Sequence, residues 1–199
     1  MLRLSSYFVL FFFFGSCGRI YWDNTISSYA SDYDYRYQTY KNIEHRKLNW
    51  SDFPGRIDPK SRAGAAIFWD ICYTLDSMYI YSNPGEDSEN WVHANINVFA
   101  GVGSLSWIDT LFKKSGQLIN HEQRHYDIAK IYAEKFRKII PSLPPFSRFN
   151  CVNRIDSAKA IVKKECMLLQ AQYDSETEHG IQRAMQEKWD KKIDILLKK

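Results

Sequence analysis

The chain of 199 residues contains no cysteines spaced as CxxC, no long run of basic residues and no apolar run long enough for a permanent membrane span. Without CxxC pairs, a zinc site built from cysteines is disfavoured. The lysines and arginines are scattered among acidic residues and leave a formal charge of only +4, so nucleic-acid binding is not predicted. No internal repeat is visible, and the length suits one domain.

The first residues, MLRLSSYFVLFFFFGSCG, combine one early cation, Arg3, with a short apolar run and then small residues. The run is too short to cross a bilayer and fits the central part of a secretory signal. Its end resembles a bacterial lipobox, in which Cys17 is lipidated, although Phe14 stands where leucine is usual. We expect residues 1–17 to be a signal peptide. The protein is then a periplasmic, outer-membrane or cell-surface lipoprotein held to the membrane by this anchor, or, after simple cleavage, a secreted protein.

Export would place the remaining cysteines in an oxidising compartment. If Cys17 carries lipid, three are left, so at most one internal disulfide forms, among Cys72, Cys151 and Cys166. The alternative is that all three are small buried apolar residues.

The patterning predicts an α+β domain. Residues 18–40 are rich in Tyr, Ser and Asp and predict a tether, and residues 41–199 predict a single domain. The segment KLNWSDFPG reads as a strand that enters a turn, and two longer strands are expected in AGAAIFWDICYTLDSMYIY and WVHANINVFAGV. Helical spacing begins after Ser106, with breaks at PSLPP and Gly180. Strands followed by helices indicate the α+β class.

The second of the three expected helices would begin near Asp156 or Ser157, either of which can cap it. The spacing of Ala158, Ile161, Val162, Leu168 and Leu169 predicts its apolar face. The last helix is expected to have apolar residues at Ile181, Met185, Trp189, Ile193 and Leu196.

The stretch INHEQRHYDI carries the strongest chemical signal. Residues four apart on a helix share a face, so His121 and His125 can direct their imidazoles at one cation. Glu122 lies one step round the helix, where its carboxylate can activate a metal-bound water without being a ligand. Only five histidines are present, which makes this spacing uncommon by chance, but a solvated helix face remains the alternative.

A third zinc ligand must come from elsewhere, and the later segment QYDSETEHG offers candidates. We expect His179 first and Asp174 second, and Asp174 could instead hold a ligand histidine as an acceptor. Tyr173 could donate to the oxyanion of the transition state, but a packed aromatic at a helix face is the simpler interpretation.

Three stretches resemble a bacterial family of domains of unknown function described as predicted secreted zinc-dependent proteases. They are RKLNWSDFPG, SWIDTLFKKSGQLINHEQRHYDI and QYDSETEHG, and the resemblance covers about Arg46 to Trp189. Tyr126 replaces the phenylalanine that is usual in the family. The resemblance implies a zincin-like fold and peptidase activity.

Carried over by position, His121, Glu122 and His125 correspond to the family's expected metal and base residues. Its second motif falls on Tyr173, Asp174, Thr177 and His179.

The sequence thus predicts an exported metallopeptidase that binds one Zn²⁺ through His121, His125 and His179, or Asp174 in place of His179. Glu122 would act as general base and acid on a peptide or protein substrate. The alternative is a non-catalytic envelope lipoprotein that keeps the scaffold for a partner or a structural metal. A third, weaker interpretation is hydrolysis of a non-protein amide, such as a cell-wall cross-link.

Overall fold

The computed structural model describes residues 19–20, 39–61, 63–81, 91–109, 115–144, 146–147 and 150–198. Side chains are described over the same ranges, except at residues 19–20, 76–81, 91–94 and 146–147. The expected signal peptide, the lipidation site Cys17 and nearly all of the expected tether therefore lie outside the described residues. In the described part, no helix is long and apolar enough to cross a membrane.

Strands come first along the chain and helices follow, as the α+β prediction requires. The sheet elements are β1 (Arg19–Ile20), β2 (Tyr40–Asn42), β3 (Ala65–Ala66), β4 (Trp69–Tyr81), β5 (Trp91–Gly103), β6 (Trp107–Ile108) and β7 (Phe146–Ser147). The helices are η2 (Trp50–Asp52), α1 (Gly116–Ile139), η3 (Ile140–Ser142), α2 (Cys151–Thr177) and α3 (Arg183–Leu196). The α+β class is confirmed.

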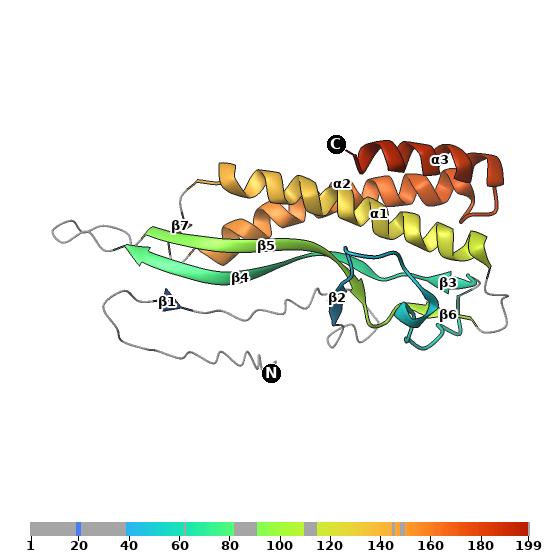
Figure 1. Ribbon diagram of the computed structural model, residues 1–199, viewed down its shortest axis with the longest axis horizontal. Coiled ribbons are helices and arrows are strands. Elements are labelled where there is room, and N and C mark those ends of the chain that lie inside the picture. The colour runs from blue at the N-terminus through green and yellow to red at the C-terminus, as the bar shows by residue number, and fades with distance from the viewer. Residues whose placement is uncertain are drawn as a thin grey trace.

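A long antiparallel hairpin, β4 with β5, forms the centre of the main sheet, whose order is β1-β4-β5-β2 with β7 also paired to β5. A register shift between Leu75 and Ser77 marks a bulge in β4. A separate two-stranded sheet pairs β3 with β6. Helices α1 and α2 lie on one side of the hairpin, and α3 packs on α1 and α2 (Figure 1).

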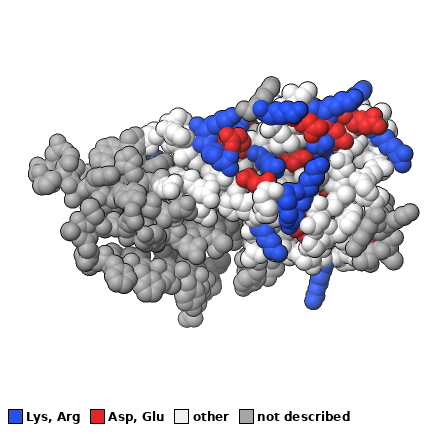
Figure 2. All heavy atoms as spheres, viewed as in Figure 1, with Lys and Arg blue, Asp and Glu red and all other residues white. Residues whose placement is uncertain are grey.

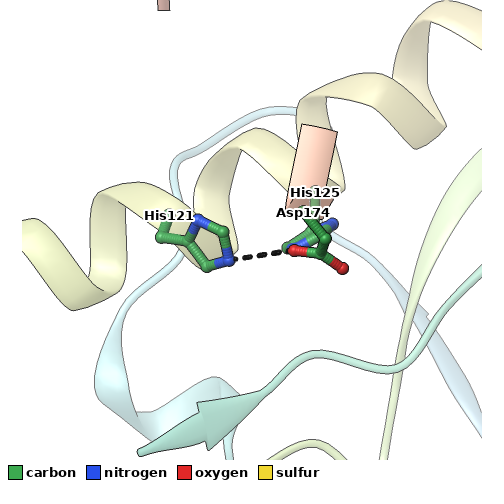
Figure 3. Close-up of side chains that lie close together, drawn as sticks. All are labelled: His121, His125 and Asp174. Carbon is green, nitrogen blue, oxygen red and sulfur yellow. Dashed lines mark hydrogen bonds and ion pairs between the residues drawn. The ribbon is translucent and has the colours of Figure 1, made fainter. Parts of the chain in front are cut away.

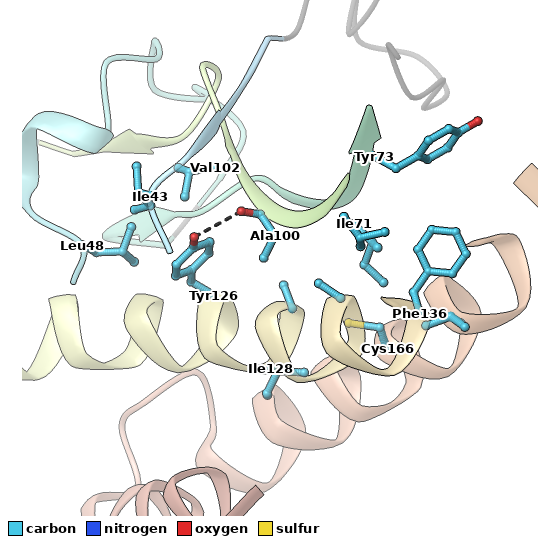
Figure 4. Close-up of a cluster of buried hydrophobic side chains, with 14 of the residues drawn as sticks. Ile43, Leu48, Ile71, Tyr73, Ala100, Val102, Tyr126, Ile128, Phe136 and Cys166 are labelled. Carbon is cyan, nitrogen blue, oxygen red and sulfur yellow. Dashed lines mark hydrogen bonds between the residues drawn. The ribbon is translucent and has the colours of Figure 1, made fainter. Parts of the chain in front are cut away.

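The core lies between α1 and the hairpin. Alternation along β5 buries Val98, Ala100 and Val102 and leaves Asn95 and Asn97 exposed, as predicted for a strand with one polar face. From α1, the ring of Tyr126 enters this layer and its hydroxyl donates to the carbonyl of Ala100 at 3.1 Å (Figure 4). This packing fixes the rotation of α1, and with it the direction in which the rest of the helix points.

The predicted strand in KLNWSDFPG is wrong, because its middle forms the short helix η2. The side chain of Asn49 accepts the Ser51 N–H at 2.9 Å, and the carboxylate of Asp52 accepts the Asn49 N–H at 2.8 Å. These two local bonds form a capping box, which competes successfully with extended backbone. The Asp52 carboxylate also makes a bidentate ion pair with Arg46.

The predicted start of the second helix at Asp156 or Ser157 is also wrong. Helix α2 begins at Cys151, and its N-cap residue Asn150 makes no side-chain capping bond. Burial of Cys151 and Ile155 against the core compensates for the missing cap.

The predicted apolar face of α2 is only partly right, because Ile161 and Leu168 are exposed. Polar residues occupy buried positions of this helix instead. Lys159 is buried beside the carboxylate of Asp70, at 3.3 Å, and Lys163 lies 2.9 Å from the same carboxylate. A buried charge with such partners avoids the cost of an isolated one.

All three described cysteines are free and buried, as the second of the two interpretations expected. Burial raises the pKa of the Cys72 and Cys166 thiols to about 12. They act as small apolar residues of the core.

Charged side chains of both signs are interleaved over the helices on the face shown in Figure 2. No field of a single sign gathers on this face, in keeping with the mild net charge.

Candidate metal site

Helix α1 carries His121, Glu122 and His125 in its N-terminal half, where all three side chains are buried. The side chain of Ser115 caps the helix by accepting the Leu118 N–H at 3.0 Å. The helix is regular through the motif, so the two imidazoles project from one face, with ring centroids 4.7 Å apart. Both histidines are buried.

Asp174, from α2, completes a three-residue group with the two histidines. Its Oδ1 atom lies 2.9 Å from Nε2 of His125 and 3.3 Å from Nε2 of His121. The two Nε2 atoms are 3.2 Å apart. Figure 3 shows the three side chains meeting at one place, two from α1 and one from the helix above it. In the described residues this is the one group with metal-ligand geometry.

The triangle of these three atoms has the size of one face of a tetrahedral zinc site. Zinc binds histidine nitrogen and carboxylate oxygen at about 2.0–2.2 Å, which sets neighbouring ligand atoms of a tetrahedron about 3.3–3.5 Å apart. The observed edges of 2.9, 3.2 and 3.3 Å are close to this, with one edge compressed. One small cation can therefore contact all three atoms.

The other ring nitrogen of His125 is held by Gln170. The amide nitrogen of Gln170 donates to the backbone carbonyl of His125 at 2.8 Å, so its amide oxygen faces Nδ1 of the same histidine. An oxygen acceptor requires a proton on Nδ1. In the neutral ring, Nε2 then carries a lone pair, which points at Asp174.

His121 is held in the same way by Tyr173 and Gln186. The hydroxyl of Tyr173 donates to the amide oxygen of Gln186 at 2.9 Å, and it lies 2.9 Å from Nδ1 of His121. The amide nitrogen of Gln186 donates to Asp190, which leaves its amide oxygen facing Nδ1 of His121 at 3.3 Å. Nδ1 therefore carries the proton here too, and Nε2 is left as a lone pair.

Two nitrogen lone pairs and a carboxylate oxygen thus converge. Oδ1 of Asp174 is buried and has no hydrogen-bond partner. Such an atom carries a substantial desolvation cost unless a cation or proton lies beside it. Burial opposes its charge, but His121 and His125 outweigh that effect when their rings are protonated, and they lower the pKa of Asp174. The donor set fits a divalent cation that accepts nitrogen and oxygen ligands, as zinc does.

Glu122 is buried beside the group and faces the same pocket. Its Oε2 accepts the backbone N–H of Ile67, just after β3, at 3.0 Å. Burial raises the pKa of Glu122, while the nearby His125 and His121 act in the opposite direction. It lines the same pocket as the ligand triangle without joining it, as a general base requires.

His179, our first expectation for the third ligand, lies beside the group and not in it. Its side chain is 78% exposed, and Nδ1 is 3.5 Å from Oδ1 of Asp174. Helix α2 ends at Thr177, and the next three residues all have left-handed backbone, with φ of 46°, 53° and 83° at Glu178, His179 and Gly180. The structure thus brings Asp174, the alternative ligand, to the two histidines.

Gly180 explains why this turn can pass so close to the site. A Cβ atom at position 180 would lie 3.0 Å from both Cγ and Nδ1 of His121. Glycine also tolerates the positive φ at no steric cost. The turn therefore packs directly on the imidazole of His121.

An open pocket of about 880 Å³ surrounds the group. One part of its lining is the segment Ala63–Ile67, which includes β3, and another is the turn from His179 to Arg183. Figure 1 shows β3 below the first half of α1 and the α2–α3 connection above it. The volume suits a small molecule or a few residues of a peptide.

Tyr173 is not among the residues that line this pocket. It is fully buried and stacks on His121, with ring centroids 4.9 Å apart. Its hydroxyl contacts the Nδ1 side of that ring and not the Nε2 side. The structure thus places Tyr173 as a support for a ligand histidine.

Sequence reasoning missed Gln170 and Gln186. A signal for the first was present, because Gln170, Tyr173, Asp174 and Thr177 follow helical spacing on one face of α2. The sequence signal for Gln186 was weaker. This residue lies three residues before Trp189 and seven before Ile193, on the buried face of α3.

Residues 107–180 of the chain match a family model described as "Bacterial protein of unknown function (DUF922)". The match includes the three residues of the ligand triangle, Glu122 and His179, and it ends before α3 supplies Gln186. The LNWSDFPG segment also lies outside it. No curated protein and no solved structure gave a match to the chain.

Proposed function

We propose that the protein is a zinc-dependent hydrolase that cleaves peptide bonds, with a zincin-like arrangement of its active-site helix. The observation that carries the proposal is the buried convergence of two Nε2 lone pairs and the orphaned Oδ1 of Asp174. Glu122 next to this convergence adds the group that hydrolysis needs.

In this proposal His121, His125 and Asp174 hold the zinc. When bound, zinc supplies a Lewis acid that polarises the scissile carbonyl and lowers the pKa of a water molecule. Gln170, Tyr173 and Gln186 fix the ring orientation and protonation of the two histidines.

Glu122 performs the proton transfers. Its carboxylate takes a proton from the water that attacks the carbonyl carbon, and it returns that proton to the leaving nitrogen as the carbon–nitrogen bond breaks. The pKa of this buried carboxyl is raised, which favours accepting a proton near neutral pH. The hydrogen bond from Ile67 holds one carboxylate oxygen in place during both steps.

The test is a cleavage assay on a mixed peptide library with zinc-loaded protein, read by mass spectrometry. We expect cleavage by the wild type, and a rate at least about 100-fold lower for Glu122→Gln at equal zinc content. Glu187→Gln, which removes an exposed carboxylate from α3, is the matched control and should cleave normally. An unchanged rate in Glu122→Gln would refute the assignment of the base.

If zinc binds stoichiometrically but no peptide, ester or cell-wall amide is cleaved, the peptidase proposal fails. That result would support the alternative of a non-catalytic envelope protein with a structural metal. Cleavage of a cell-wall amide alone would support the third interpretation.

We also propose that the protein is exported and anchored through lipid on Cys17. The support is the sequence MLRLSSYFVLFFFFGSCG. Metabolic labelling with a radioactive fatty acid should mark the wild type and not Cys17→Ser. Equal labelling of both would contradict the anchor, and failure of Cys17→Ser to leave the membrane fraction would point to another attachment.

A further inference from the structure

Among the residues that the structure describes, Arg183 is the only lysine or arginine that lines the pocket. The other ionisable side chains of the lining are the three histidines, Glu122 and Asp174. Four of these side chains already have a role in the proposed chemistry: His121, His125 and Asp174 as metal ligands and Glu122 in the proton transfers. A fixed positive charge on the pocket wall is therefore left without a role in the proposed chemistry.

Nothing in the described residues neutralises this charge. Arg183 is exposed and makes no ion pair or hydrogen bond there. It is the first residue of α3, whose first turn contains no acidic residue. Glu187, one turn further along, does not pair with it. The guanidinium is thus free to bind a negative group that enters the pocket.

The backbone position of Arg183 relative to the metal group is set by contacts on both sides of it. The turn before it packs on His121 through Gly180, and the carbonyl of Gly180 accepts a hydrogen bond from Gln117 of α1 at 2.7 Å. On its other side, Gln186 of the same helix contacts Nδ1 of His121. These contacts fix the backbone at Arg183 beside the ligand triangle, within reach of a substrate that enters the pocket.

We propose that Arg183 is a specificity-determining residue that binds a carboxylate of the substrate. A guanidinium suits this task because it binds a carboxylate through two parallel hydrogen bonds. The carboxylate can be the C-terminus of a short peptide or the side chain of an Asp or Glu residue near the scissile bond. This inference rests on the proposed function, and it adds the class of substrate that the pocket selects.

The test measures binding, so that it does not depend on turnover. Zinc-loaded Glu122→Gln protein is titrated into fluorescent peptides, and anisotropy gives the dissociation constant. One pair of peptides differs only in a free or an amidated C-terminus, and a second amidated pair differs only in Glu or Gln at an internal position. The two pairs separate the two sources of the carboxylate.

We expect one of the pairs to show about ten- to a hundredfold tighter binding of the charged member. Adding Arg183→Gln should abolish that preference with little change for the neutral member. Lys188→Gln, which removes an exposed charge from the same helix, should leave it intact. In active protein, the same loss should appear as a higher KM with little change in kcat.

The inference is overturned if neither pair shows a preference, or if the preference survives in Arg183→Gln, since the carboxylate would then bind elsewhere, such as at the metal. It is also overturned if Lys188→Gln has the same effect, because the cause would be net charge. Failure of the proposed function gives a different result, namely a zinc-loaded wild type that binds peptides but cleaves none.

Discussion

Oδ1 of Asp174 lies 2.9 Å from Nε2 of His125, although the two side chains come from different helices and Asp174 lies a full helix later in the chain. The contact depends on the packing of α2 along α1. It places a carboxylate opposite two histidines, and the arrangement of those histidines depends only on their four-residue spacing within α1. The candidate site is therefore a property of the helix pair, and changes that shift one helix against the other should disturb it.

Gln186 offers the first test of this dependence, because it reaches His121 from α3. We expect Gln186→Ala to lower zinc affinity by about ten- to a hundredfold, since the ring of His121 loses an acceptor that fixes its orientation. Competition with a chromogenic chelator gives the affinity. Glu187→Ala, an exposed neighbour on the same helix, is the control. Equal affinities for all three proteins would mean that α3 does not support the ligand.

Gly180 offers a second test of the packing around His121, because its backbone conformation and its contact with that ring both require glycine. Alanine there must adopt a φ of 83° and place its Cβ 3.0 Å from the ring of His121. We expect Gly180→Ala to lower the free energy of unfolding by roughly 1–3 kcal/mol and to weaken zinc binding. Urea unfolding of the zinc-free protein measures the first effect.

Gly116→Ala is the matched control for that experiment. Gly116 begins α1, and a Cβ there would meet nothing within 4 Å. We expect no loss of stability and a gain of up to about 1 kcal/mol, because alanine restricts the unfolded chain. If both variants lost the same stability, the close approach at Gly180 would not be the cause.

The buried cysteines predict low reactivity. Burial raises the pKa of Cys72 and Cys166 to about 12, so at pH 8 only about one thiol in ten thousand is ionised. We expect iodoacetamide at pH 8 to leave Cys72, Cys151 and Cys166 unmodified in the folded protein and to modify all three in guanidinium. Peptide mapping by mass spectrometry reads each site. Rapid labelling of any of them in the folded protein would contradict its buried position.

The ion pair of Asp52 with Arg46 predicts a pH-dependent contribution to stability. Burial acts to raise the pKa of Asp52, but the hydrogen bonds from Arg46 and from the Asn49 N–H outweigh it, and the pKa is lowered. A carboxyl whose pKa is lower in the folded state stabilises that state above its unfolded pKa, near 3.8, and loses the effect as pH falls through the folded value.

We therefore expect zinc-free wild type to exceed Asp52→Asn in free energy of unfolding at pH 7, by about 1 kcal/mol because Arg46 is partly exposed. The difference should shrink steadily below about pH 4. Urea unfolding at a series of pH values measures it. A difference that stays constant down to pH 2 would show that the charge of Asp52 is not responsible.

The parts of the site that follow from spacing along one helix could be predicted from the sequence. His121 and His125 share a face because they are four residues apart, and Glu122 follows from the same geometry. Strand β5 could be predicted for a similar reason, because its apolar and polar residues alternate with a period of two. These features require no knowledge of how the elements pack.

The remaining parts depend on local competition or on packing. The capping box at Asn49 turned an expected strand into a short helix. Whether Asp174 or His179 reaches the two histidines depends on where α2 ends. The left-handed backbone of the three residues after Thr177 places His179 away from the helix face that carries Asp174. Gln186 reaches His121 only because α3 folds back on α1, which no local pattern encodes.

Zinc content after removal of excess metal, measured in the wild type, Asp174→Ala and His179→Ala, shows whether Asp174 is the third ligand. We expect one zinc per chain in the wild type, a loss of at least about a hundredfold in affinity for Asp174→Ala, and near wild-type affinity for His179→Ala. Full zinc content in Asp174→Ala together with loss in His179→Ala would contradict this assignment, because the metal would then depend on the exposed histidine. A wild type that binds no zinc would contradict it altogether.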